Sequence, residues 1–181
     1  ANSAAMTFVV ANRLSPLLSG DASSAFVTRA ARAQSVLNDL GVWASVQFAK
    51  LPANQRVLVN DHQTYSHLAS RYDLEEISML DSYTTGGALK PSSLNAITEA
   101  VTNSGAKVIF SSYLPANKSL RRISKRSGLP IASTPLYGEG LAPGETAVST
   151  ATENICSILN GQGASCDQAA ATALANRWES I

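Results

Sequence analysis

The sequence predicts an α/β fold in which a four-stranded parallel sheet is flanked by helices and preceded by a long amino-terminal helix. After Pro52, short apolar runs alternate with segments of helical periodicity, which is typical of a parallel sheet with right-handed crossovers. We expect strands at 56–59, 75–80, 107–110 and 130–134 and intervening helices at 62–72, 91–104 and 116–127. Two further helices are expected at 146–159 and 168–178.

The first 51 residues are predicted to be helical. One helix spans 4–18, and a second extends from Asp21 to Phe48, where Leu51-Pro52 ends it. At 1.5 Å per residue the second helix is about 40 Å long, which is long for a small domain. Its apolar residues recur three and four apart and form one stripe: Phe26, Ala30, Ala33, Leu37, Leu40 and Ala44. We therefore expect a helical segment at 1–51 and an α/β lobe at 52–181.

Composition bounds the class of protein. The chain has 181 residues, of which 45% are apolar and 15% charged, as expected for a globular protein with one core. The formal net charge of +1 gives no reason to expect nucleic acid or an anionic membrane as a partner. No apolar run approaches the roughly 20 residues that a membrane-spanning helix needs.

The two cysteines lie ten residues apart near the carboxyl end. Cys156 and Cys166 are separated by the turn Asn160-Gly161-Gln162-Gly163, which allows them to meet. A single disulfide would indicate an oxidising compartment. Two unpaired thiols are the alternative, because spacing alone does not establish the geometry that a disulfide requires.

His62 is the first candidate functional residue. It follows the apolar run Val57-Leu58-Val59, and Asn60 and Asp61 are expected to form the turn and cap the next helix. This places His62 just beyond the carboxyl end of a strand, the edge at which open α/β sheets bind ligands. A histidine in this position can bind a metal ion, transfer a proton or cap the helix.

Glu139 is the second candidate. It lies between Gly138 and Gly140 after the last predicted strand, and therefore at the same edge of the sheet as His62. An imidazole and a carboxylate make half of a four-coordinate metal site. The alternatives are a solvated turn residue, or a hydrolase with His62 as general base oriented by Glu139, although no nucleophile or phosphate-binding motif accompanies them.

Two other features are interpreted as structural. His67 lies five residues after His62, a spacing that does not place both on one helical face as zinc pairs require. The predicted helix at 116–127 carries a basic face, for which a solvated surface is the default interpretation; its members are Lys118, Arg121, Arg122, Lys125 and Arg126.

From Asn2 to about Gly161 the chain resembles the carboxyl-terminal part of the zinc- and manganese-binding proteins of bacterial ABC uptake systems. The resemblance is carried by LPANQRVLVNDHQTYSHLASRYDL, KPSSLNAITEAVTNSGAKVIF and SGLPIASTPLYGEGLAPGE. It implies two α/β lobes joined by one rigid helix, which here ends at Phe48. The chain would then be one lobe of a two-lobed metal-binding protein, and the amino-terminal lobe would be missing from it.

The resemblance also implies a metal site and a function. In the family the metal ion lies between the lobes, and His62 and Glu139 fall on the two ligand positions of the second lobe. The implied function is non-enzymatic: capture of a divalent transition metal, zinc more than manganese, for delivery to an ABC permease. With only two ligands, this chain is expected to hold the metal weakly.

Location and partners follow from the same resemblance. We expect a periplasmic or extracellular protein that is associated with the membrane in the full system. A surface module that binds a partner by adhesion, without transport, is the alternative.

Self-association through the amino-terminal helices is also expected, because the long apolar stripe needs cover. The alternative is that the helix at 4–18 covers the stripe alone.

Overall fold

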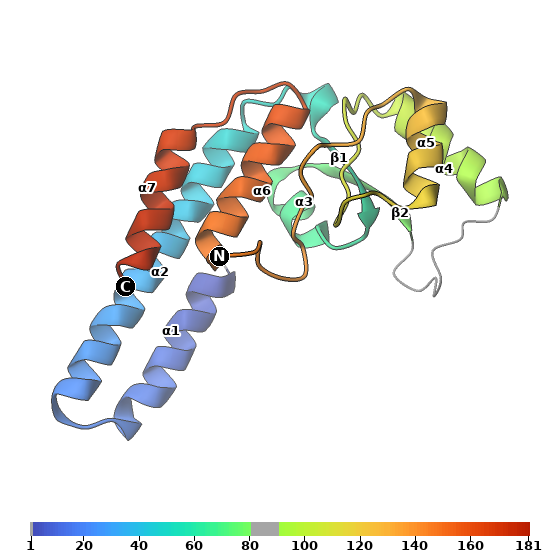
Figure 1. Ribbon diagram of the computed structural model, residues 1–181. Helices are drawn as coiled ribbons and strands as arrows, with labels where there is room; N and C mark the ends of the chain where they lie inside the picture. Colours follow the sequence, from blue (N-terminus) through green and yellow to red (C-terminus); the bar gives the residue numbers. More distant parts are fainter. Residues whose placement is uncertain (1, 81–90) are drawn as a thin grey trace.

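The computed structural model describes residues 2–80 and 91–181, and a parallel β pair lies between two groups of helices (Figure 1). Within these residues no helix is long and apolar enough to cross a membrane. In chain order the elements are α1 (Asn2–Leu14), η1 (Ser15–Leu17), α2 (Gly20–Phe48), η2 (Ala53–Gln55), β1 (Val57–His62), α3 (Ser66–Tyr72), β2 (Glu75–Leu80), α4 (Pro91–Asn103), α5 (Lys118–Ser127), α6 (Ala147–Gly161) and α7 (Gln168–Glu179).

The sheet is parallel, as predicted, but only two of its four segments are continuous strands. β1 pairs with β2 in a register that sets Val57 opposite Glu75 and His62 opposite Leu80. The segments predicted as strands at 107–110 and 130–134 form a single parallel bridge, between Ile109 and Ile131. A hydrogen bond of 2.8 Å from the Phe110 N–H to the Val59 carbonyl joins this bridge to β1. The segments therefore lie in the order β2, β1, 107–110 and 130–134.

Successive residues of the buried segments point to opposite faces of the sheet and supply two separate cores. Leu58 and Phe110 belong to a core shared with α2, α6 and α7. Val59 and Ile109 belong to a second core shared with α4 and α5. This alternation explains why consecutive apolar residues such as Val57, Leu58 and Val59 are all buried, as is usual for a parallel sheet that is covered on both faces.

The junction between β1 and α3 differs from the prediction. Asn60 and Asp61 were expected to form a turn and an N-cap, with a helix from His62 to Tyr72; instead both residues continue the strand, His62 ends it, and α3 begins at Ser66. The strand is longer because its polar residues are buried, at 2% exposed for Asn60 and 0% for Asp61, and are hydrogen-bonded by neighbouring segments.

The predicted long helix is observed as α2, whose 29 residues make it about 43 Å long. Its second half is part of the lobe, since Val36, Trp43 and Phe48 are buried in the core with α6 and α7. Its first half packs against α1, with which it forms a hairpin that extends from the body (Figure 1). Along the predicted stripe Phe26 is half-buried beside α1, whereas Leu37 packs against the core with α6 and α7, so α1 covers only part of the stripe.

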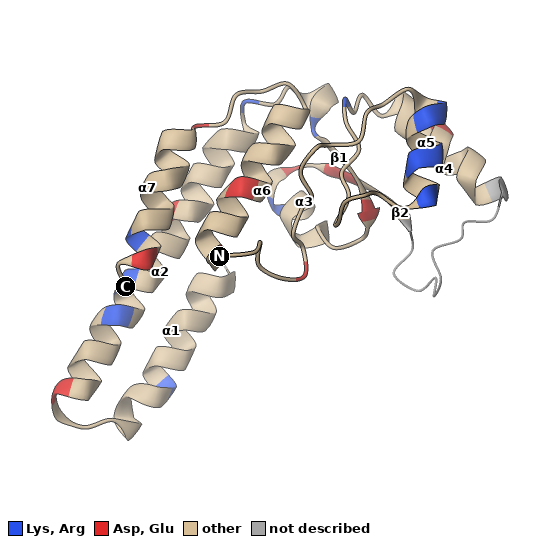
Figure 2. Ribbon diagram, viewed as in Figure 1, with Lys and Arg blue, Asp and Glu red and all other residues tan. Residues whose placement is uncertain are grey.

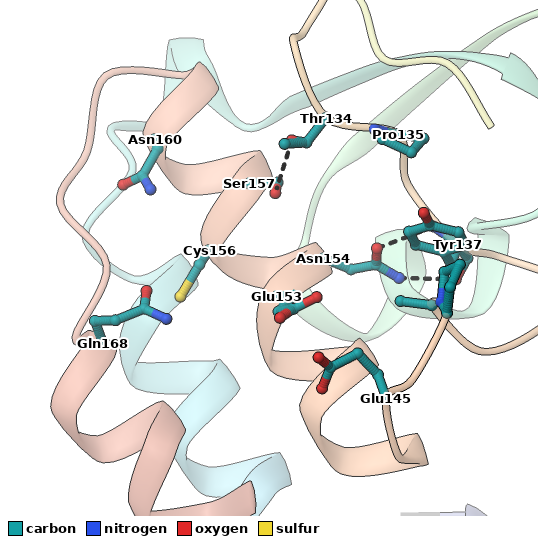
Figure 3. A pocket seen from close by; sticks show the side chains of 12 residues that line it. Thr134, Pro135, Tyr137, Glu145, Glu153, Asn154, Cys156, Ser157, Asn160 and Gln168 are labelled. Atoms are coloured by element: carbon teal, nitrogen blue, oxygen red, sulfur yellow. Dashed lines mark hydrogen bonds between the residues drawn. The ribbon is translucent and has the colours of Figure 1, made fainter. Parts of the chain in front are cut away.

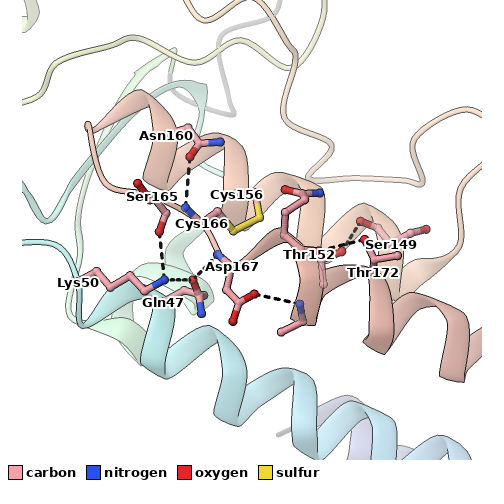
Figure 4. Close-up of a disulfide and its surroundings, with 12 residues drawn as sticks. Gln47, Lys50, Ser149, Thr152, Cys156, Asn160, Ser165, Cys166, Asp167 and Thr172 are labelled. Carbon is pink, nitrogen blue, oxygen red and sulfur yellow. Dashed lines mark hydrogen bonds between the residues drawn. A yellow bond between two sulfur atoms is a disulfide. The ribbon is translucent and has the colours of Figure 1, made fainter.

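Cys156 of α6 and Cys166 of the loop before α7 form a disulfide, so the alternative of two free thiols is wrong (Figure 4). The same loop is tied to the end of α2. The buried side chain of Gln47 accepts hydrogen bonds from the Asp167 N–H at 3.0 Å and from Lys50 Nζ at 2.7 Å. The disulfide and these hydrogen bonds hold α6 and α7 against α2.

Candidate functional site

His62 is the last residue of β1, at the carboxyl end of the parallel pair. Its side chain is partly exposed, whereas the five residues before it are buried. The chain turns sharply after it, because the Thr64 N–H donates to the His62 carbonyl at 2.8 Å. The imidazole is therefore presented at the edge of the sheet by a strand that is itself fixed in the core.

The residue before it, Asp61, anchors this strand end. Its carboxylate is fully buried and accepts a hydrogen bond from Ser111 Oγ at 3.0 Å. It also accepts from the Ser112 N–H at 3.0 Å and from Ser112 Oγ at 2.7 Å. These donors follow the third segment of the sheet, so Asp61 fixes the distance between the two neighbouring segment ends. Sequence reasoning missed this role; the signal was a carboxylate directly continuing an apolar strand.

Glu139 lies at the tip of a loop that is held on both sides of it. Before the tip, Leu136 is buried and the backbone of Tyr137 is clamped by Asn154, which accepts from the Tyr137 N–H at 3.0 Å and donates to its carbonyl at 2.7 Å. After the tip, the Ala142 N–H donates to Thr150 Oγ1 at 3.0 Å. The Glu139 side chain itself is exposed.

Gly138 brings this loop onto the turn after His62. A Cβ added at Gly138 would lie 2.7 Å from Thr64 Oγ1, which requires one of the two groups to shift, and 3.1 Å from Tyr65 Cζ, which is tighter than an ordinary contact. Only a residue without a side chain allows so close an approach. Gly138 therefore serves to pack the loop against the turn at 64–65.

One pocket of about 320 Å³ results from these contacts. His62 and Glu139 both line it, so the structure brings the two sequence-predicted residues together. The polar side chains of Thr64, Ser112 and Tyr113, none of which was predicted as a site residue, share the lining. His67, by contrast, is exposed on α3 and is not among the residues that line this pocket.

Three carboxylates act on Tyr65, which is buried beside this pocket with a hydroxyl that has no hydrogen-bond partner among the described residues. Burial raises the pKa of the Tyr65 hydroxyl above its ordinary value, and the charges of Asp61, Glu76 and Glu139 raise it further. The ion pairs found within residues 2–80 and 91–181 involve none of the three. The pocket therefore lies in a negative environment, which favours a cation.

The donor atoms of the pocket fit a transition metal only in part. Imidazole nitrogen and carboxylate oxygen are both zinc ligands, at about 2.0–2.2 Å from the ion. A closed site needs four ligands, and no group of three or more His, Cys, Asp and Glu side chains is found in the described part of the chain. His62 and Glu139 can therefore supply part of a coordination shell.

A second pocket, of about 430 Å³, lies between the loop at 134–145 and α6 (Figure 3). Glu145 and Glu153 line it together, and burial and then the charge of Glu145 raise the pKa of Glu153. Tyr137 lines both pockets, and the Asn154 clamp on its backbone is drawn in Figure 3. Asn154 thus fixes the wall that the two pockets share.

The packing of Gly138 predicts an effect on stability. Gly138→Ala should lower the free energy of unfolding by about 1–3 kcal/mol, because its Cβ displaces the turn at Thr64 and Tyr65. Gly140→Ala is the matched control, since no atom lies within 4 Å of an added Cβ there, and it should change stability by less than about 0.5 kcal/mol. Urea unfolding measures both; equal stability of the two variants would contradict the observed contact.

The raised pKa of Tyr65 predicts a loss of stability at alkaline pH. The unfolded chain releases this proton near its ordinary pKa of about 10, whereas the folded protein retains it to higher pH. The contribution of Tyr65 to stability is therefore complete below about pH 10 and is lost as the pH rises further. Urea unfolding at about pH 8 and pH 11 gives the decrease in the free energy of unfolding between the two. This decrease should be about 1 kcal/mol smaller for Tyr65→Phe than for the unaltered chain.

Tyr113→Phe provides the control for this measurement. Tyr113 lines the same pocket, but its side chain is 49% exposed. Its replacement should leave the alkaline loss of stability unchanged. If Tyr65→Phe and Tyr113→Phe lose stability in parallel with the unaltered chain, the burial of the Tyr65 hydroxyl does not govern this behaviour.

Known structures share this fold. The periplasmic zinc binding protein TroA from Treponema pallidum matches with a TM-score of 0.72 at 19% identity, over 85% of this chain and 58% of that one. Fe(III)-bound YtgA from Chlamydia trachomatis matches with a TM-score of 0.72 at 18% identity, over 89% of this chain and 59% of that one. The laminin binding protein Lmb of Streptococcus agalactiae matches with a TM-score of 0.60 at 18% identity, over 93% of this chain and 58% of that one. Lmb is described as bifunctional, with adhesin and metal transporting activity.

These likenesses show the fold, and the chain spans a little under 60% of the length of each of these three proteins. A comparison with curated proteins gave no match. The family model "ZnuA: Zinc-uptake complex component A periplasmic" matches residues 1–161. This is a family of binding proteins, so the expectation of a non-enzymatic protein is confirmed and the alternative of a hydrolase based on His62 is set aside. The chain belongs to this family, the periplasmic metal-binding solute-binding proteins of ABC transporters.

Proposed function

We propose that this chain is the lobe of a metal-uptake protein that supplies His62 and Glu139 as ligands to a divalent transition metal. The observation that carries the proposal is the shared pocket of these two residues, among carboxylates that have no cationic partner in the described part of the chain. The metal is the cargo, and the protein delivers it to an ABC permease in the membrane. Binding and release require only coordination bonds.

Zinc is the preferred cargo in this proposal, with manganese second. An imidazole ligand favours zinc over manganese, and a given set of nitrogen and oxygen ligands generally binds zinc more tightly. The names of the similar structures do not decide the metal, since they include a zinc binding protein and an Fe(III)-bound protein. The remaining ligands would come from the amino-terminal lobe that the family resemblance implies.

The proposed protein acts outside the cytoplasm, in the periplasm or at the cell surface, where the full system brings it to the membrane. Two observations support this location. The family is periplasmic, and the Cys156–Cys166 disulfide is of a kind that persists in oxidising compartments.

A zinc titration tests the two ligands. The imidazole signals of His62 should respond to zinc in a proton–nitrogen NMR titration of the 181-residue chain, with a Kd weaker than about 1 μM because two ligands leave the site incomplete. His62→Ala and Glu139→Gln should each remove most of this response. His67→Ala and Glu145→Gln are the matched controls, because they remove the same groups outside the pocket.

Two results would count against the proposal. The assignment of ligands is wrong if zinc binds with the same affinity after His62→Ala. A form extended by an amino-terminal lobe should bind zinc at least about 100-fold more tightly than the short chain, and His62→Ala should reverse that gain. Absence of both zinc and manganese binding by the extended form would exclude a transport role for these metals.

We also propose that the 181-residue chain associates with a second copy through the α1–α2 hairpin. Eight apolar side chains on this hairpin are 39–78% exposed, and so much exposed apolar surface favours a partner that covers it. The hairpin carries few charges that would oppose contact (Figure 2). The exposed apolar residues are Met6, Phe8, Val9, Val10, Leu14, Leu17, Leu18 and Val27.

Light scattering at micromolar concentration tests this association. The unaltered chain should have the mass of a dimer, and Phe8→Ser with Leu17→Ser should give a monomer because both remove apolar surface from the hairpin. Leu141→Ser is the control, since Leu141 is 57% exposed in the loop after Glu139 and should leave the mass unchanged. A monomeric unaltered chain would refute the association.

A further inference from the structure

The most strongly charged surface of the described chain is one face of α5. Its five basic residues are all exposed, and their spacing places them on one face, about 12 Å long, which we call the α5 basic stripe (Figure 2). The opposite face packs into the core through Leu120 and Ile123, which are 1% and 0% exposed. The stripe consists of Lys118, Arg121, Arg122, Lys125 and Arg126.

The charge of the stripe is not compensated by neighbouring side chains that the structure describes. None of its members forms an ion pair within residues 2–80 and 91–181, and Arg126 donates instead to Asn95 Oδ1 at 2.7 Å. The stripe carries +5, and the rest of the chain, with nine basic and thirteen acidic residues, carries −4. The net charge of +1 therefore conceals a strongly polarised molecule.

The stripe also acts against the stability of its own helix. Lys118 lies in the first turn, where the positive end of the helix dipole disfavours a cation, although Lys125 and Arg126 in the last turn are favourably placed. Like charges three and four residues apart, such as Lys118 and Arg122, repel each other. A solvated face does not require this arrangement, so the stripe indicates a surface that binds an anionic partner.

We propose that the α5 basic stripe binds an anionic lipid surface. Every exposed residue of α5 is basic, so no apolar or aromatic side chain interrupts the stripe. The core of a packed protein interface is enriched in arginine but also in aromatic side chains and methionine, and this face has neither of the last two. A flat layer of phosphate headgroups requires only exposed positive charge, and each basic side chain near it adds to the attraction. An acidic protein surface is the competing partner that the experiment separates.

The test measures the partition of the intact 181-residue chain onto vesicles by sedimentation. Vesicles of phosphatidylcholine with about 30% phosphatidylglycerol should bind the chain at least about tenfold better than phosphatidylcholine alone at low salt. Raising the salt to about 0.15 M should weaken this binding several-fold, because the interaction is electrostatic and screened. Equal binding to both kinds of vesicle, or none, would overturn the proposal; no binding would favour an acidic protein partner instead.

Two charge-matched variants locate the binding surface. Arg121→Gln with Arg122→Gln should lower binding to the anionic vesicles about tenfold or more. Arg71→Gln with Lys107→Gln removes the same charge from exposed positions outside α5 and the α1–α2 hairpin, and should change binding less than about twofold. Glutamine is a good helix former and removes repulsion, so α5 should remain folded, which circular dichroism checks. An equal loss in both variants would refute the stripe as the binding site.

Discussion

A buried carboxylate ties together two segment ends that border the pocket shared by His62 and Glu139. Asp61 is 0% exposed, and burying an unpaired charge of this kind costs several kcal/mol unless hydrogen bonds replace its lost hydration. Ser111 and Ser112 provide those hydrogen bonds from the neighbouring segment. An acidic pair at these two positions could not donate in place of the serines. The position of His62, the next residue along, follows from this contact.

The other half of the pocket depends on topology and on one glycine. His62 and Glu139 are far apart in the sequence, but both follow segments of one parallel sheet, whose carboxyl ends meet at a single edge. Gly138 then allows the loop to approach the turn at Thr64 and Tyr65. A larger residue there would change the position of Glu139 without altering any ligand. The geometry of the site is thus set by residues that do not themselves offer a ligand.

The helices and the order of elements were predictable, because periodicity and terminal signals are local. The helix predicted at 146–159 is observed as α6, and Thr146 and Ser149 form the capping box that begins it. The end of β1 was not predictable from local signals, because Asn60 and Asp61 also suit a turn. Their partners lie 16 and about 50 residues away, and only the assembled sheet reveals them. The sequence predicted the two candidate ligands, His62 and Glu139, but not the buried Asp61 that fixes the strand end before His62.

The last two segments of the sheet show a related limit. Apolar runs predicted full strands at 107–110 and 130–134, yet only Ile109 and Ile131 form a bridge. Pro130 and Pro135 lack an N–H group, so the fourth segment cannot donate regularly to a ladder. Its carbonyl groups still accept, as the hydrogen bond from the Ile109 N–H to the Pro130 carbonyl shows. The chain is therefore free to leave the sheet soon after Ile131 and to form the loop that carries Glu139.

The distribution of charge shows why net charge is a poor guide to the partners of this chain. Charges act over a screening length of about 8–10 Å, so a ligand responds to the local charges and not to their total. Around the pocket, Asp61, Glu76 and Glu139 lack cationic partners in the described residues, and the same field that raises the pKa of Tyr65 would attract a metal ion. The carboxylates of Asp61 and Glu76 accept hydrogen bonds from Ser111 Oγ and the Tyr65 N–H, whereas the Glu139 side chain is exposed. Asp61 and Glu76 thus add negative charge to this region, whereas the carboxylate of Glu139 is exposed at the pocket. In the proposed metal-binding role Glu139 is therefore the carboxylate placed to coordinate, and the number of ligands, more than the charge, would limit the affinity for a cation.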